Sequence, residues 1–255
     1  MLHELEIQGF RCFPSLTAKP LGRVNLLVGK NNAGKTAFLD AVELVAWEGT
    51  PPIFRSLVRR EEYSWMVVNN GGGRTVNRFD LDVPSLFHGH SIHADSSFSI
   101  RGDKRSFVVR CAREENIFSL PTIHIEAEQT WSFDLVRGYM RRIEIEGHLE
   151  ELFSRSRTEV LFLPTWRSDL VFLSRLWDEV LLTDDESLVV EALKLVEPRV
   201  ERVAFRGERQ DRNVAVRFNG EKQPRWIGSL GDGMRHMLAL ALHLVPAQNG
   251  YLLID

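Results

Sequence analysis

The sequence predicts an α/β fold, and three local patterns predict it. An apolar run at residues 24–28 leads into a glycine-framed loop at residues 29–34 and then into helical apolar spacing at residues 35–47. A second glycine-containing segment opens an apolar helical stretch at residues 233–244, and the sequence ends on a short apolar strand, residues 251–255. Alternating patterns between these ends favour further strands. We therefore expect a mixed sheet with an antiparallel β subdomain and a helical insertion.

Composition is that of an ordinary globular protein. Of the 255 residues, 44% are hydrophobic and 26% are charged, which excludes a disordered, collagen-like or disulfide-scaffold chain. The formal net charge of −3 argues against a generic nucleic-acid coat but leaves room for one local basic groove.

Cysteine use and hydropathy bear on the compartment. Cys12 and Cys111 form no CxxC pair, which favours a reducing environment. No apolar run reaches the roughly 18 residues that a membrane span needs, and the first residues lack the pattern of a signal peptide. We therefore expect a cytoplasmic protein with no membrane partner.

The elements of the first half follow in chain order. Alternation of Leu5 and Ile7 predicts a strand that Gly9 ends, and the run VNLLV at residues 24–28 predicts a short buried strand before the first helix. Residues 48–95 are rich in proline, glycine and histidine, and they are predicted as loops with short elements between them. Further strands are predicted at residues 97–100, 106–110, 123–126 and 143–145, the first two joined as a hairpin by RGDK.

The second half is predicted to begin with helices and to end with strands around one more helix. Helices are predicted at residues 148–154, 169–182 and 185–196, the last with Asp184 and Asp185 supplying its N-cap and Pro198 stopping it. Strands are predicted at residues 200–205 and 214–218, and Asn219-Gly220 predicts a two-residue turn into a third strand near residues 226–227.

The most specific motif is GKNNAGKT, which fits GxxxxGK[ST] at every fixed position between a predicted strand and a predicted helix. Glycines let successive backbone N–H groups point into one concavity, which holds phosphates together with the positive end of the following helix. The motif assigns the lysine to the β and γ phosphates of a nucleotide and the threonine hydroxyl to Mg²⁺. The predicted nucleotide-binding residues are Gly29, Asn31, Asn32, Ala33, Gly34, Lys35 and Thr36.

Two weaker motifs lie near the C-terminal end. The segment SLGDG, residues 229–233, opens a predicted helix, and YLLID places Asp255 at the tip of an apolar strand. The second pattern is typical of a Walker B strand, whose aspartate helps to hold Mg²⁺. Many buried strands end in aspartate, so the prediction of Asp255 as a metal ligand depends on the other two motifs.

Taken together, GKNNAGKT, SLGDGMRHMLALAL and YLLID resemble the ABC-type ATPases of the SMC, RecF and OLD group, which are often described as AAA-family ATP-binding proteins. The opening IQGFRCF also resembles that group. The resemblance covers about residues 1–47 and 200–255 and implies a P-loop NTPase fold of ABC-ATPase-head type. It implies one head with a P-loop lobe of residues 1–50 and 200–255 and an insertion at about residues 51–199.

The resemblance also implies roles for residues outside the P-loop. The signature motif would contact the γ-phosphate of ATP held by the other protomer, and it would comprise Ser229, Gly231, Asp232 and Gly233. Asp232 departs from the family's usual SGG. Arg11 would lie beside the bound phosphates, and a solvated arginine on an edge strand is the alternative.

The end of the sequence bears on turnover. In the family a catalytic glutamate follows the Walker B aspartate at once, but this sequence stops at Asp255. We therefore expect the C-terminal part of the head to be missing and ATP hydrolysis to be impaired in this chain.

Two function hypotheses follow from the resemblance, both with ATP and Mg²⁺ as ligands. The first is an ATPase that forms an ATP-dependent homodimer in DNA repair or phage defence, with a nuclease or DNA as possible partner. The second is a nucleotide-gated binding module that regulates a partner such as a nuclease without turnover. A third hypothesis, the ATPase subunit of a membrane transporter, is disfavoured by the FRCF opening and by the long stretch between Lys35 and Asp255.

Overall fold

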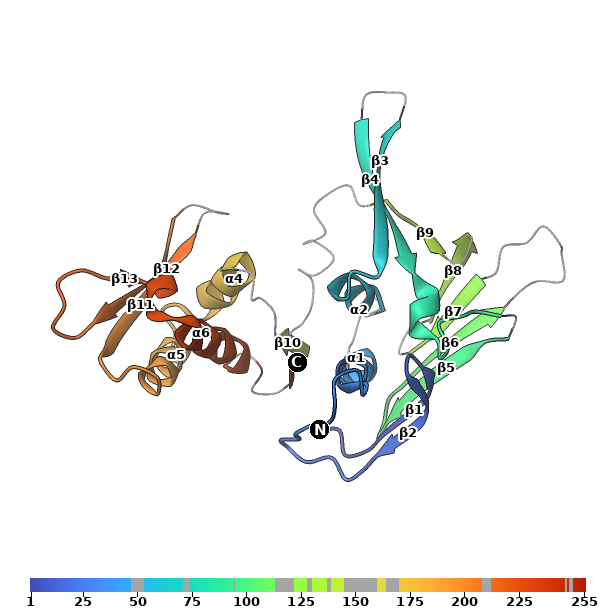
Figure 1. Cartoon of the computed structure of the whole chain (residues 1–255), viewed down its shortest axis with the longest axis horizontal. Coiled ribbons are helices and arrows are strands. Elements are labelled where there is room, and N and C mark those ends of the chain that lie inside the picture. The colour runs from blue at the N-terminus through green and yellow to red at the C-terminus, as the bar shows by residue number, and fades with distance from the viewer. Residues whose placement is uncertain are drawn as a thin grey trace. The chain divides into compact units, whose positions relative to one another are not determined.

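The computed structural model describes residues 1–46, 53–70, 74–93, 95–112, 122–127, 130–136, 139–144, 160–163, 170–207, 212–245, 247 and 250–255. The chain divides into two compact units, residues 1–157 and 158–255. Figure 1 labels the elements of both units. The predicted lobe of residues 1–50 and 200–255 draws on both units and stays a prediction.

A nine-stranded sheet dominates the first unit, and each pair of neighbouring strands is antiparallel. Its strand order is β2-β1-β5-β6-β7-β8-β9-β4-β3. The strands are β1 (Leu5–Phe10), β2 (Phe13–Ala18), β3 (Tyr63–Asn70), β4 (Arg74–Asp82), β5 (Ser97–Gly102), β6 (Ser106–Ala112), β7 (Thr122–Glu126), β8 (Thr130–Val136) and β9 (Tyr139–Glu144). This sheet is the predicted antiparallel β subdomain.

Helices α1 (Lys35–Ala46) and α2 (Ile53–Arg59) cover one face of this sheet, and the short 3-10 helix η1 (Val83–Leu86) follows β4 (Figure 1). Alternate side chains of β5 and β6 point into the resulting core, as a period of two requires. Phe98 lies at its centre, with its ring centroid 5.1 Å from that of Phe10 and 5.2 Å from that of Phe87. The core therefore joins β1 and β5 to the segment that follows η1.

The predicted strand at residues 24–28 is not a strand in the structure. The segment has no regular secondary structure, and its three alternate apolar side chains, Val24, Leu26 and Val28, are 86 to 90% exposed. A buried strand needs hydrogen-bonded neighbours, and none of the described strands pairs with this segment. The prediction was wrong because apolar composition alone does not supply a neighbour.

The stretch predicted as loops between residues 48 and 95 contains more regular structure than expected. It includes α2, β3 and β4, and β3 pairs with β4 from Tyr63↔Leu81 to Asn70↔Arg74. The three glycines therefore separate the strands of one long hairpin. Gly9 also does not end β1, because its φ of 66° lets the strand continue to Phe10.

The second unit packs three helices against a three-stranded antiparallel sheet of order β11-β12-β13. The strands are β11 (Val200–Arg206), β12 (Asn213–Phe218) and β13 (Arg225–Trp226). The helices are α4 (Leu170–Val180), α5 (Asp185–Lys194) and α6 (Asp232–Leu244), with the 3-10 helix η3 (Ile227–Leu230) before α6. These helices confirm the predictions at residues 169–182, 185–196 and 233–244, apart from small differences at the ends.

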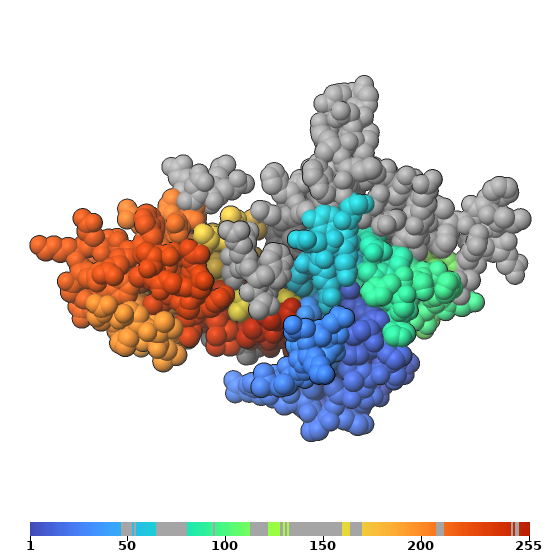
Figure 2. All heavy atoms as spheres, in the orientation of Figure 1, coloured from blue at the N-terminus to red at the C-terminus, as the bar shows by residue number. Residues whose placement is uncertain are grey.

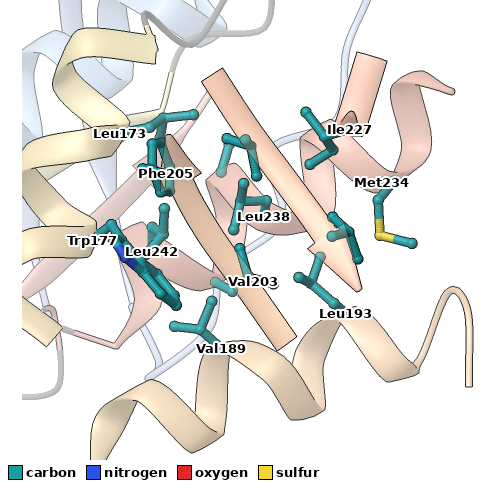
Figure 3. Packing of buried hydrophobic residues seen from close by; sticks show 14 of the residues in the cluster. Leu173, Trp177, Val189, Leu193, Val203, Phe205, Ile227, Met234, Leu238 and Leu242 are labelled. Carbon is teal, nitrogen blue, oxygen red and sulfur yellow. The ribbon is translucent and has the colours of Figure 1, made fainter. Parts of the chain in front are cut away.

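One hydrophobic core holds this unit together (Figure 3). Trp177 of α4 and Phe205 of β11 meet with ring centroids 5.8 Å apart. Val189 and Leu193 reach the core from α5, and Leu238 reaches it from α6. Residues spaced three or four apart on each helix face this core, which explains why their helical periodicity was visible in the sequence.

Two local predictions in this unit need correction. The turn at Asn219-Gly220 forms, because the N–H of Glu221 donates to the carbonyl oxygen of Phe218 at 3.1 Å, but the chain then runs on to β13 at Arg225, so the connection between the strands is longer than two residues. Asp184 precedes α5 but makes no side-chain capping bond, because its backbone is already helical, with φ −62° and ψ −26°.

The last strand of the sequence, β14 (Tyr251–Ile254), pairs in parallel with β10 (Val160–Leu163). β14 confirms the strand predicted at residues 251–255, and β10 is formed by the apolar, strand-like run VLFL at residues 160–163. β9 confirms a strand up to residue 144, whereas residue 145 and the predicted helix at residues 148–154 lie outside the described residues. Within the described part of the chain, no helix is long and apolar enough to cross a membrane.

Candidate functional site

Residues 29–34 form a loop that leads directly into α1, whose first two residues are Lys35 and Thr36. The N–H of Ala33 donates to the carbonyl oxygen of Lys30 at 3.2 Å, and the N–H of Phe38 donates to the carbonyl oxygen of Gly34 at 2.8 Å. Asn32 and Gly34 have positive φ angles of 62° and 91°, which asparagine and glycine tolerate better than other residues. Left-handed residues within such a turn are typical of the backbone concavities that bind anions.

The side chain of Lys35 folds back over this loop. Its Nζ donates to the carbonyl oxygens of Gly29 at 3.0 Å and Lys30 at 2.8 Å. Both acceptors are neutral, and an anionic phosphate oxygen is the stronger partner for an ammonium group. The lysine is therefore held by the loop at groups that a phosphate can replace.

Gly34 lies against the turn between β1 and β2. A Cβ at this position would lie 2.6 Å from Sγ of Cys12 and 2.7 Å from Cζ of Phe13, closer than a Cβ can approach. The positive φ and this contact each make a larger residue unfavourable at position 34. The β1–β2 turn thus supports the loop, a role that the sequence did not reveal for Cys12 and Phe13.

Arg11, in the same turn, is buried, with 4% of its surface exposed. Its Nη1 and Nη2 donate to the two carboxylate oxygens of Glu62 at 2.8 and 2.9 Å, and Nη2 also donates to Oγ of Ser56 at 3.0 Å. Its Nε lies 3.2 Å from Oδ2 of Asp40. The solvated arginine considered as the alternative is therefore wrong, whereas contact with a phosphate stays a prediction.

Asp40 and Glu43 place two fully buried carboxylates on α1. Nη2 of Arg59 lies 2.5 Å from Oδ1 of Asp40 and 2.6 Å from Oε2 of Glu43. Burial lowers the pKa of Arg59, but the charges of Glu43 and Asp40 outweigh it and hold the pKa above the ordinary arginine value. The sequence carried one signal of this pairing, two acids three apart on an otherwise apolar helix.

Thr36 and Asp255, the two predicted Mg²⁺ ligands, both lie at ends of regular elements. Thr36 is half-buried in the first turn of α1. The N–H of Asp255 donates to the carbonyl oxygen of Leu163 at 3.0 Å, which extends the ladder between β10 and β14. Asp255 therefore follows the carboxyl end of a parallel strand pair, where ligands of α/β proteins commonly bind. The two residues belong to different units.

The signature segment lies at the start of α6. Oγ of Ser229 donates to the carbonyl oxygen of Trp226 at 2.7 Å, and Gly231 has a φ of 88°. Apart from the chain neighbours of each glycine and, for Gly233, the nearby backbone of α6, no described atom lies within 4 Å of where a Cβ would stand at Gly231 or Gly233. Asp232 is exposed, and no side chain caps the helix. The first turn of α6 is therefore open to a ligand within its own unit.

Comparison with known proteins identifies the N-terminal part of the chain. There is no match among curated proteins. The matching solved structures include one of the recombination mediator protein RecF with ATP, which is 12% identical, covers 100% of this chain and 85% of that chain, and has a TM-score of 0.37. A family model described as AAA ATPase domain matches residues 1–91, so the segment that holds the P-loop has the sequence of this ATPase family.

Proposed function

We propose that the protein binds ATP with Mg²⁺ at the P-loop of an ABC-type ATPase head that dimerises around the nucleotide. The observation that carries this proposal is the loop at residues 29–36. It combines two left-handed residues, an ammonium group held by neutral carbonyls and the start of a helix, in a segment that matches an AAA ATPase domain.

The residues present fit a nucleotide and its metal ion. Backbone N–H groups of residues 31–36 and the Lys35 ammonium are the donors for phosphate oxygens. The Thr36 hydroxyl and the Asp255 carboxylate are the ligands for Mg²⁺, which neutralises phosphate charge when it is bound. The orphan N–H groups at the start of α1 add to this anion site.

Exposed features of both units support a larger assembly. The apolar side chains of residues 24–28 support a head in which this segment gains a neighbouring strand. The open first turn of α6 supports a contact between Ser229 or Gly231 and the γ-phosphate on a second protomer. The role in DNA repair or phage defence, with a nuclease or DNA as partner, rests on the sequence resemblance.

The test is competition of ATP with a fluorescent ATP analogue, with Mg²⁺ and with EDTA in its place. We expect ATP to bind more tightly with Mg²⁺, and Thr36→Val to lose most of that difference because it lacks the hydroxyl ligand. Thr17→Val, on an exposed position of β2, is the matched control and should keep it. Failure of the unchanged protein to bind ATP in either buffer would refute the proposal.

A further inference from the structure

A buried cluster of charges connects α1, α2 and the β1–β2 turn. In Figure 2 the blue atoms of α1 and the cyan atoms of α2 lie in contact, and the charges pair across this boundary. The cluster comprises Asp40 and Glu43 of α1, Arg55 and Arg59 of α2, Arg60 and Glu62 just after α2, and Arg11 of the turn.

The two carboxylates of α1 require these arginines. A buried carboxylate without a partner is strongly unfavourable, and both Asp40 and Glu43 have no exposed surface. Asp40 lies within 3.2 Å of guanidinium nitrogens of Arg11, Arg59 and Arg60. Through its contact with Asp40, Arg11 is therefore held against α1, the helix that follows the P-loop.

Arg11 is fixed at its backbone as well as at its side chain. Its N–H donates to the carbonyl oxygen of Leu86 at 2.8 Å, and its own carbonyl oxygen lies 3.0 Å from Nδ1 of His88. Its φ of 50° is unusual for a residue other than glycine, and it turns the chain from β1 into Cys12. The next two residues are those that contact Gly34.

We propose that Arg11 is a positioning residue of the P-loop. Through Asp40 and Glu62 it holds the β1–β2 turn against Gly34, and it acts on the nucleotide without touching it. Gly34 directly precedes α1 and Asp40 lies within α1, so the turn contacts both the loop and the helix. This inference rests on the proposed binding of ATP at the P-loop.

A direct contact with phosphate makes a different prediction. If Arg11 bound the γ-phosphate, its loss would weaken ATP binding more than ADP binding. A positioning residue sets the shape of the whole loop, so its loss weakens the binding of ATP and the binding of ADP by the same factor. Loss of the Glu62 carboxylate, which pairs with Arg11, would then also weaken the binding of both nucleotides, although a carboxylate cannot itself bind a phosphate.

The first experiment is calorimetric titration of ATP and ADP into Arg11→Gln, Glu62→Gln and Arg110→Gln. Arg110 pairs with Glu126 on the exposed surface of the same sheet, so Arg110→Gln is the matched control. We expect Arg11→Gln to weaken both nucleotides at least tenfold, with the ratio of their affinities changed less than twofold. Glu62→Gln should weaken both severalfold, and the control should change neither.

The second experiment is the rate at which a thiol reagent labels Cys12 without nucleotide. Cys12 is exposed beside Gly34 and Cys111 is buried, so the fast labelling phase reports on the turn. We expect the rate to rise severalfold in Arg11→Gln and Glu62→Gln and to stay unchanged in Arg110→Gln. Should Arg11→Gln fail to fold, Glu62→Gln decides, because it keeps a hydrogen-bonding side chain.

Two results would overturn the inference. One is a loss of affinity confined to ATP, which would assign Arg11 to the γ-phosphate. The other is unchanged affinity and unchanged Cys12 labelling in a folded Arg11→Gln or Glu62→Gln. If the unchanged protein binds neither nucleotide, the proposed function fails, whereas the labelling rates still decide whether Arg11 positions the turn.

Discussion

Gly34 has no space for a side chain and Gly233 has ample space, so alanine substitutions at the two positions should have different effects. Alanine at position 34 would meet Cys12 and Phe13 at a φ of 91°, whereas position 233 is open and is the second residue of α6. We expect Gly34→Ala to lower the free energy of unfolding by about 1–3 kcal/mol and to weaken ATP binding. Gly233→Ala should be neutral or stabilising by up to about 1 kcal/mol. Urea unfolding of both variants checks this, and equal effects would contradict it.

His243 makes the stability of the second unit depend on pH. It is buried, its Nδ1–H donates to the carbonyl oxygen of Ala239 at 2.6 Å, and its Nε2 has no hydrogen-bond partner among the described residues. Burial lowers the pKa of His243 in the folded protein below the ordinary value of about 6.5. The unfolded chain therefore binds a proton more readily than the folded one.

The sign of the pH effect follows from this difference. The stabilising effect of neutral His243 is complete above about pH 6.5 and is lost as the pH falls from there through the folded pKa, by at most about 1.4 kcal/mol per pH unit. Urea unfolding between pH 5 and 8 should show a weaker pH dependence in His243→Gln. His236→Gln, on the exposed side of α6, should behave like the unchanged protein. An unaltered slope in His243→Gln would contradict the assignment.

At the scale of residues, the sequence allowed a site to be predicted only where its residues form one contiguous motif. Residues 29–36 were assigned to a nucleotide site because GxxxxGK[ST] sets both spacing and residue type, and their contact with a nucleotide stays a prediction. The partners of Arg11 were not found, because Asp40, Ser56 and Glu62 meet it only after α1 and α2 have packed. An acidic pair on an apolar helix face indicates that such partners exist but does not say which arginines they are.

At the scale of elements, α4 depends on one large side chain. Trp177 is 2% exposed and packs on Phe205 of β11, so its removal leaves a cavity. We expect Trp177→Ala to destabilise the second unit by about 3–5 kcal/mol. Trp226→Ala, at a position that is 49% exposed, should change the stability by about 0.5 kcal/mol or less. Circular dichroism in urea measures both, and similar losses would refute this account of the core.

The elements that were predicted correctly are those whose apolar periodicity or turn residues lie within a short stretch of sequence. The hairpin of β5 and β6 forms around RGDK, and α6 follows the apolar spacing of its sequence. Residues 24–28 and the β3–β4 hairpin were misjudged for opposite reasons. The apolar run lacks a neighbouring strand in its unit, whereas the hairpin forms despite the three glycines between its strands.

At the scale of the whole molecule, we expect dimers that depend on ATP. A non-hydrolysable ATP analogue should double the mass measured by light scattering, whereas ADP and buffer alone should leave monomers, because in the proposed dimer only the γ-phosphate reaches the first turn of α6 on a second protomer. Ser229→Arg should prevent the dimer by filling that space, with nucleotide binding by the monomer nearly unchanged.

The matched control for this variant is Ser187→Arg on α5. Both serines are exposed, and each Oγ donates to the carbonyl oxygen three residues earlier at 2.7 Å. Only Ser229 belongs to the signature segment, so Ser187→Arg should still dimerise. A monomer under every condition, or a dimer that ignores both the nucleotide and Ser229→Arg, would reject this mode of association.

Binding of ATP at the P-loop is tested most directly by calorimetric titration of ATP into the unchanged protein, Lys35→Ala and Lys194→Ala. Lys194 pairs with Glu191 on the surface of α5 and serves as the control. We expect Lys35→Ala to weaken ATP binding at least tenfold, about 1.4 kcal/mol, because it removes the ammonium group assigned to the β and γ phosphates. Equal ATP affinities for Lys35→Ala and the unchanged protein would contradict it.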